Sequence, residues 1–215
     1  MIMSLLDFIF SKIMGRELNK SEMLEDPFIQ FRKWYQFAKR IKIIPFYNRM
    51  VLSTVRKDRL PSSRVVLLKM FDNRGFVFFT NYRSNKAIDI QNNAATSILF
   101  YWPLIERQVR INGSVEKTSR KDSKEYFRTR PRKSQIGAWA SEQSSILDCR
   151  KDFENRILKY TEKYRGKDVP CPPYWGGYRL VPTSFDFWQA RMNRLHDRFS
   201  YIINNNEWVV NRLSP

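Results

Sequence analysis

The sequence is poor in the residues that bind transition metals or form disulfides: its 215 residues include two cysteines and one histidine. Cys149 and Cys171 lie far apart and form no CxxC pair, so we expect neither a disulfide framework nor a zinc site. With His196 as the only histidine, we expect no metal centre of any kind. Sparse, unpaired cysteines are typical of proteins from a reducing compartment.

Glycine is also scarce, with seven residues in the whole chain. No Walker loop, no GxGxxG after a strand, no GxSxG elbow and no HExxH motif is present. The sequence therefore gives no support to a nucleotide site built on a glycine-rich loop. The pair Gly176–Gly177 in "WGGY" predicts a turn that enters a strand.

Long hydrophobic runs are missing too. The apolar opening "MIMSLLDFIF" is interrupted by Asp7, follows no basic region and is too short to span a bilayer. We interpret it as an amphipathic arm or packing segment and not as a signal peptide. We therefore expect a cytoplasmic protein with no membrane partner.

Hydrophobic residues and positive charge are abundant. A hydrophobic fraction of 42%, with 15% aromatic residues, predicts a packed core. The formal net charge of +18 predicts attraction to polyanions, which include nucleic acid, anionic membranes and phosphorylated small molecules. Net charge alone does not choose among these partners.

The pattern of apolar residues predicts an α+β domain of mostly antiparallel strands with helices packed outside. Asp26 and Pro27 predict a helix start, and Ser84 and Ser119 are placed to cap two later helices. We expect an arm over residues 1–25 and one domain over 26–215. Helices are predicted at 26–41, 84–93, 119–130 and 146–165, and strands at 50–55, 63–70, 75–80, 96–102, 107–118, 178–189, 198–203 and 207–213.

Cationic and hydroxyl side chains occur at the ends of these elements. Ser84 and Lys86 stand at a predicted helix start, where free N–H groups and the helix dipole favour a phosphate. Tyr126 and Arg130 are one helical turn apart, and Ser134 follows just after Pro131. Together these three could surround a phosphate dianion. The number of such groups points to more than one phosphate.

Several blocks carry a specific resemblance: "SRVVLLK", "FFTNYRSNKA", "ERQVRINGSVEK", "YFRTRPRKSQIGAWASEQSS", "WGGYRLVP", "FWQ" and "RLHDRF". Their order and spacing resemble the pyridoxamine 5′-phosphate oxidase family from about residue 26 to the last residue. The resemblance implies a split β-barrel, FMN-binding fold and a homodimer with FMN at the subunit interface. It also implies oxidation of pyridoxamine or pyridoxine 5′-phosphate by O₂ to pyridoxal 5′-phosphate, with release of hydrogen peroxide.

The same resemblance implies which residues form the site. The substrate would contact Lys69, Tyr126, Arg130, Ser134, Arg194, Leu195 and His196. Of these, Arg194 and His196 would be the catalytic pair beside the pyridine ring. FMN would contact Arg64, Val65, Val66, Leu67, Leu68, Lys69, Phe79, Thr80, Lys86, Gln108, Gln143, Ser144, Trp188 and Arg198.

Three features depart from the family pattern. Asn85 stands where the family usually has an arginine, which removes one expected ligand of the FMN phosphate. Residues 190–193 read "ARMN" where the family tends to glycines, and a changed turn there could shift Arg194. No Arg…Tyr pair that could close over the site precedes Asp26.

In the sequence His196 lies between Arg194 and Arg198, to which the resemblance assigns contacts with the substrate and with FMN. Alternation along an extended segment would place the three side chains on one face, toward one cavity. Two other functions remain open. The basic run at 117–133 could bind nucleic acid, and the chain could be a flavin-binding relative without oxidase activity. The presence of every predicted substrate-contacting residue argues against a flavin-binding relative without oxidase activity.

Overall fold

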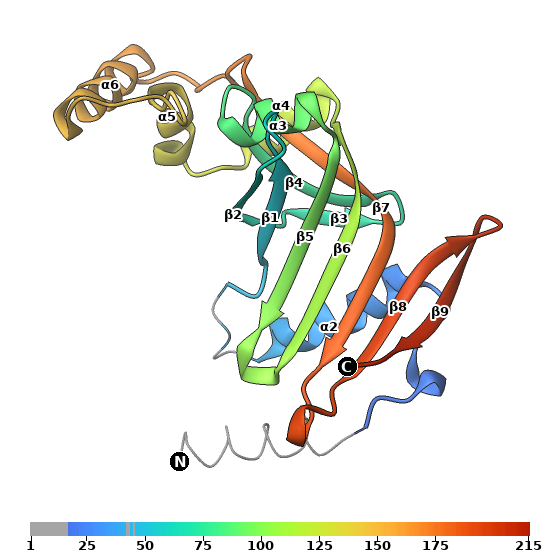
Figure 1. The fold of residues 1–215 in the computed structure, drawn as a ribbon. Coiled ribbons are helices and arrows are strands. Elements are labelled where there is room, and N and C mark those ends of the chain that lie inside the picture. The colour runs from blue at the N-terminus through green and yellow to red at the C-terminus, as the bar shows by residue number, and fades with distance from the viewer. Residues whose placement is uncertain (1–16, 42–43, 45) are drawn as a thin grey trace.

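The computed structural model describes residues 17–41, 44 and 46–215 (Figure 1). The apolar opening segment lies outside the described residues. The predicted division into an arm at 1–25 and a domain at 26–215 stays a prediction. Within the described part of the arm, the N–H of Leu18 donates to Asp197 Oδ2 at 2.9 Å. Both Leu18 and Met23 are buried against the core.

Nine strands form a single curled sheet in which every neighbouring pair is antiparallel. The order is β2-β1-β5-β6-β7-β4-β3, and a hairpin of β8 and β9 joins through β7. This is the split β-barrel arrangement of an α+β fold, as predicted. The strands are β1 (Arg49–Val55), β2 (Pro61–Leu67), β3 (Met70–Asp72), β4 (Gly75–Asn81), β5 (Ala95–Trp102), β6 (Arg107–Lys117), β7 (Trp175–Gln189), β8 (Asp197–Asn204) and β9 (Glu207–Leu213).

Helices lie around this sheet (Figure 1). The helix predicted from Asp26 is present, because Asp26 accepts hydrogen bonds from the N–H groups of Phe28 (2.6 Å) and Ile29 (3.4 Å). Its apolar face buries Phe31 and Trp34 in the main core. The helices are η1 (Lys20–Glu22), α2 (Pro27–Arg40), α3 (Asn85–Asn92), η2 (Pro103–Ile105), α4 (Arg120–Arg128), α5 (Arg132–Ala140), α6 (Arg150–Lys163) and η3 (Met192–Arg194). None in the described ranges is long and apolar enough to cross a membrane.

Strand β7 holds the sheet together. One edge of β7 pairs with β6, while the other edge pairs first with β4 and then with β8. The turn predicted at Gly176–Gly177 was wrong: both glycines lie inside β7 and pair with Thr80 and Phe79. A side chain on Gly176 would collide with Tyr82, so glycine permits a close approach here and does not make a turn.

Three further details differ from the predictions. Helix α5 was not predicted. The strand predicted at 63–70 ends at Leu67, and Met70 begins β3. Ser84 is the N-cap residue of α3, but its hydroxyl donates to the carbonyl of Asn81 at 2.7 Å and caps no helical N–H.

Candidate active site

A cleft of about 650 Å³ opens between β2, β4 and the helices α4 and α5. It gathers many of the predicted FMN and substrate residues: Val65, Val66, Leu67, Lys69, Phe79, Thr80, Lys86, Tyr126, Arg130, Ser134 and Gln143. It also includes residues that were not predicted, among them Asn81, Trp175 and Ser141. Trp175 stands in the "WGGY" motif, so an aromatic residue beside two glycines was the available signal.

One end of the cleft is an aromatic stack with a buried cation. The ring of Phe79 stacks on Tyr126 at 4.0 Å and on Trp175 at 5.3 Å. The Arg130 guanidinium lies 4.7 Å from the Trp175 ring centroid, and its Nη1 is buried with no hydrogen-bond partner among the described residues. Burial lowers the pKa of Arg130. A buried donor without a partner is costly, and an anionic ligand would satisfy it.

A second cation lies at the other side of the cleft, on α3. The Lys86 ammonium donates to Thr80 Oγ1 (3.2 Å), Ser84 Oγ (3.0 Å) and Gln143 Oε1 (3.1 Å). Burial, and next the charge of Arg64, lower the pKa of Lys86 to about 8. An anion bound here would restore the charged form of the amine.

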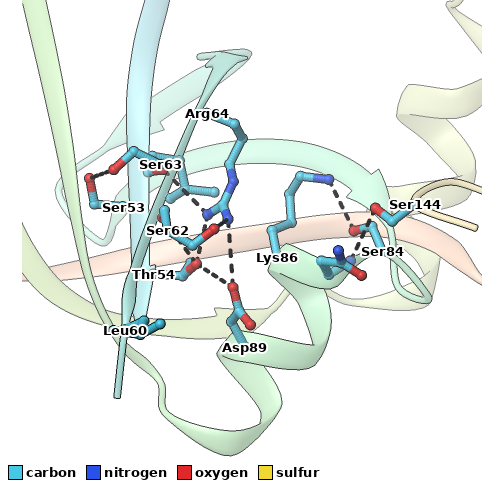
Figure 2. A network of polar contacts seen from close by, with 12 residues as sticks. Ser53, Thr54, Leu60, Ser62, Ser63, Arg64, Ser84, Lys86, Asp89 and Ser144 are labelled. Atoms are coloured by element: carbon cyan, nitrogen blue, oxygen red, sulfur yellow. Dashed lines mark hydrogen bonds and ion pairs between the residues drawn. The ribbon is translucent and has the colours of Figure 1, made fainter. Parts of the chain in front are cut away.

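Arg64 is held by a polar network shown in Figure 2. Its Nη1 donates to Thr54 Oγ1 at 2.6 Å, and Thr54 in turn donates to Asp89 Oδ2 at 2.7 Å. The Arg64 Nη2 lies 3.6 Å from the same carboxylate oxygen of Asp89. Burial lowers the pKa of Arg64, and Asp89 opposes this shift. Sequence reasoning missed Thr54 and Asp89; the available signal was an acidic residue inside a short helix.

Ser144 completes this side of the site, although it lies outside the lining of the cleft. The backbone N–H of Asn85, at the start of α3, donates to Ser144 Oγ at 3.2 Å (Figure 2). Ser144 has a φ of 75°, which is unusual for a residue other than glycine and is common at functional positions. Its hydroxyl therefore lies at the N-terminus of α3, where the helix dipole favours an anion.

The remaining predicted residues form a second group at the far end of β7. Trp188 is opposite Gln108 on β6 and opposite Arg198 on β8. The His196 ring lies 4.7 Å from the Trp188 ring, and His196 Nδ1 accepts a hydrogen bond from the Arg191 N–H at 3.1 Å. Trp175 begins this strand and Trp188 is its second-last residue, and the extended path between them is roughly 40 Å long. One copy of the chain therefore does not unite the two groups.

The prediction that residues 194, 196 and 198 alternate along an extended segment was wrong. Met192–Arg194 form a 3₁₀ turn, and Arg194 has a φ of 61°. Arg194 is exposed, and Leu195 is 68% exposed. The Nη2 group of Arg198 donates a hydrogen bond to Asp186 at 2.6 Å. Hydrogen bonding to this carboxylate raises the pKa of Arg198.

The donor set of the cleft fits FMN and a phosphorylated substrate. Arginine, lysine and hydroxyl groups occur at two separated positions, so two phosphates can be bound at once. The stacked rings of Phe79, Tyr126 and Trp175 form one flat wall of the cleft. Leu68, another predicted contact, is buried behind the lining. No group of three or more metal-binding side chains occurs in the described residues.

Two family profiles match the sequence. One, described as pyridoxamine 5′-phosphate oxidase, matches residues 42–162. The other, described as the pyridoxine 5′-phosphate oxidase C-terminal dimerisation region, matches residues 175–215. The first contains the residues of the cleft except Trp175, and the second contains Trp175, Trp188, Arg194, His196 and Arg198.

Individual proteins agree with these profiles. The chain is 47% identical over 199 residues to the pyridoxine/pyridoxamine 5′-phosphate oxidase of Nostoc punctiforme, covering 92% of each chain. It is 49% identical over 201 residues to the enzyme of that name from Burkholderia multivorans, covering 92% of this chain and 93% of that one.

Solved structures share the fold. PhzG from Burkholderia lata, in complex with tetrahydrophenazine-1-carboxylic acid, matches with a TM-score of 0.86 and 26% identity over 93% of this chain and 98% of its own. A pyridoxamine 5′-phosphate oxidase-related, FMN-binding protein from Nostoc punctiforme matches with a TM-score of 0.70 and 18% identity, covering 90% of this chain and 100% of its own. With its fold, its cleft and its relatives in agreement, the chain belongs to the pyridoxamine 5′-phosphate oxidase family and is an oxidoreductase.

Proposed function

We propose that this protein oxidises pyridoxamine or pyridoxine 5′-phosphate with O₂, using FMN, and releases pyridoxal 5′-phosphate and hydrogen peroxide. The observation that carries the proposal is the pairing of two separate cationic positions in one cleft with a flat aromatic wall. One position would bind the phosphate of FMN and the other the phosphate of the substrate. Relatives that are 47–49% identical carry the name of this activity.

Each position has a defined task in this proposal. Arg64, Lys86 and Ser144 would bind the FMN phosphate, and Arg130 with Tyr126, Lys69 and Ser134 would bind that of the substrate. FMN, when bound, accepts two electrons from the C4′ carbon and passes them to O₂. With the alcohol, two hydrogens leave as hydrogen peroxide; with the amine, water also supplies the aldehyde oxygen and ammonia leaves. Anchoring both phosphates orients the reacting carbon.

The second group would come from another copy of the chain. Trp188, Gln108 and Arg198 lie at the opposite end of β7 from the cleft, so they cannot cover the cleft of their own chain. A homodimer would bring the exposed Arg194 and Leu195 of one copy to the cleft of the other. The exposed apolar side chains at the cleft, Val65 (61%) and Leu67 (37%), are suited to being covered.

In that dimer Arg194 and His196 would lie against the substrate ring. The guanidinium of Arg194 carries hydrogen-bond donors and no acceptor, so its contribution is orientation and electrostatic stabilisation. A neutral His196 whose Nδ1 accepts from the Arg191 N–H carries its proton on Nε2. The Nε2–H is then free to donate to an oxygen substituent of the substrate.

The direct test uses the purified protein. We expect a yellow protein with flavin absorbance that produces one peroxide for each pyridoxal 5′-phosphate formed from pyridoxine 5′-phosphate. A colourless protein that FMN cannot reconstitute would contradict the proposal. A coloured protein that leaves both vitamers unchanged would instead identify a flavin-binding relative without oxidase activity.

A further inference from the structure

A second concave surface, which we call the basic groove, lies on the other side of α4 and α5 from the cleft. Its volume is about 1000 Å³. Six cationic side chains and a single carboxylate, that of Asp168, line it. The cations are Arg120, Lys124, Arg128, Arg132, Lys163 and Lys167. No part of the proposed oxidase site lies in this groove.

Helix α4 separates the two surfaces. Arg120, Lys124 and Arg128 recur every fourth residue, so they form one row along the helix with a rise of about 6 Å between neighbours. Tyr126 lines the cleft instead. Like charges at this spacing repel one another and destabilise a helix. A bound row of negative charges would remove that repulsion.

Two of the six cations hold the groove together. Arg120 donates to the carbonyls of Cys171 (2.8 Å), Pro172 (2.8 Å) and Trp175 (2.7 Å). Arg132 donates to the carbonyls of Lys167 (2.9 Å) and Tyr164. These bonds fix the segment between α6 and β7 against α4 and α5. The wall of the groove is therefore ordered without a ligand.

The other four cations are available to a partner. Lys124, Arg128, Lys163 and Lys167 are exposed, and within the described ranges none of their side-chain nitrogens makes a hydrogen bond or ion pair. Lys163 also lies 5.6 Å from the ring of Tyr164, an apolar support for its charged end. Four unpaired cations on one ordered concave surface create a local positive potential.

We propose that the basic groove binds the phosphate backbone of a single-stranded nucleic acid. A periodic row of cations in a groove is matched by a periodic row of phosphates. An anionic membrane fits less well, because the surface is concave and Val169, one of its apolar residues, is 5% exposed and cannot insert into lipid. Tyr164 is buried, so it cannot stack on bases, and binding would be independent of sequence.

This function goes beyond the oxidase proposal and is independent of it. The groove lies outside residues 175–215, which match the dimerisation region. In the proposed dimer the C-terminal region of one copy faces the cleft of the other, and the basic groove is lined by a different set of residues of α4 and α5 from those that line the cleft.

The test measures fluorescence anisotropy of a labelled 20-nucleotide oligouridine RNA with the FMN-loaded protein. We expect a dissociation constant on the order of 10⁻⁶–10⁻⁴ M at physiological salt, with a slope of log affinity against log salt of about −3 for four phosphate contacts. Changing Lys124, Arg128, Lys163 and Lys167 to Gln should weaken binding by about tenfold or more and flatten the slope. Oxidase activity should stay unchanged.

A matched control variant removes four exposed lysines elsewhere: Lys20, Lys33, Lys39 and Lys57. Equal loss of RNA binding in both variants would show that net charge alone drives binding, and would overturn the proposal. So would displacement of the RNA by 5 mM inorganic phosphate at constant ionic strength. Groove-dependent binding to phosphatidylserine vesicles without RNA binding would identify a membrane partner instead.

Discussion

The cleft and the C-terminal segment around His196 hold the two halves of the predicted site in very different ways. Among the cleft cations, Lys86 lies on α3, and Lys69 and Arg130 each lie two residues beyond the end of β2 or α4. Burial lowers the pKa values of Lys86 and Arg130. By contrast, Arg194 and Leu195 are exposed on a short turn with a left-handed backbone. The cleft is organised within one chain, whereas in the proposed dimer the segment around His196 would contact the cleft of another copy.

Arg130→Ala should give the largest effect. Its buried guanidinium has an unpaired Nη1 in the cleft, and loss of a buried charge that pairs with a phosphate costs about 2–5 kcal/mol. We expect kcat/KM for pyridoxine 5′-phosphate to fall by about 100-fold or more, mostly through KM. Steady-state peroxide release measures this. Lys133→Ala, an exposed neighbour on α5, is the control and should behave like wild type.

His196→Ala should lower turnover by about 10- to 100-fold while FMN stays bound. The reason is that His196 is proposed to contact the substrate and not the cofactor. Arg194→Ala should behave in the same way. Turnover and the flavin absorbance of the purified variants are both measured, and loss of FMN from either variant would contradict the assigned role.

Mixed dimers test directly whether the two halves come from different chains. At substrate concentrations well below KM, Arg130→Ala and His196→Ala should each retain about a tenth of wild-type activity or less when alone. Refolded together in equal amounts, they should recover about a quarter of wild-type activity, because half of the dimers are mixed and each has one intact site. No recovery would mean that both halves act within one chain.

The affinity for FMN should depend on pH through Lys86. The pKa of its amine is about 8 in the free protein, and a bound phosphate raises it. Between about pH 7 and pH 8 the amine is mostly charged and the phosphate is a dianion, so affinity changes little. Above pH 8 binding requires proton uptake, and the dissociation constant should rise by up to about tenfold per pH unit. Flavin fluorescence titration of the apoprotein measures this, and Lys86→Arg, which stays charged, should give a flat profile.

The smallest effect is expected for Asp89→Asn. The variant keeps a side chain that can bind Thr54 but removes the carboxylate 3.6 Å from Arg64. FMN affinity should rise severalfold, because Arg64 no longer shares its charge with Asp89, and the apoprotein should lose about 1 kcal/mol of stability. Fluorescence titration and thermal unfolding measure the two effects. Weaker FMN binding would show that Asp89 chiefly positions Arg64.

The sequence was sufficient to predict the α+β fold, because strands such as β4 and β6 are bounded by clear turn residues and the Asp26 cap marks α2. Helix α5 was missed because it begins just after Pro131 and contains Gly137, a weak helix former. Its place in the cleft depends on packing against α6. The network of Thr54 and Asp89 was missed because it joins β1 to α3, two segments that no local pattern connects.

The assignments of the site residues stay predictions, and the structure shows which of them depend on tertiary context. Tyr126, Arg130 and Ser134 line one cleft, as their spacing in the sequence indicated, and Lys69, which only the family resemblance placed with them, lines it too. The arrangement of Arg194 could not be predicted from alternation, because the 3₁₀ turn before it breaks the period of two. A left-handed backbone at arginine has no signature in a single sequence.

Strand β7 also determines when the cleft can form during synthesis. Trp175, the aromatic wall of the cleft, and the partner edge of β4 both belong to this late strand, while β4 is made much earlier. Pairing so distant along the chain closes slowly. A nascent chain on the ribosome therefore exposes the β4 edge and lacks part of the cleft until β7 emerges, so the proposed FMN cofactor would stabilise the protein only after β7 has been made.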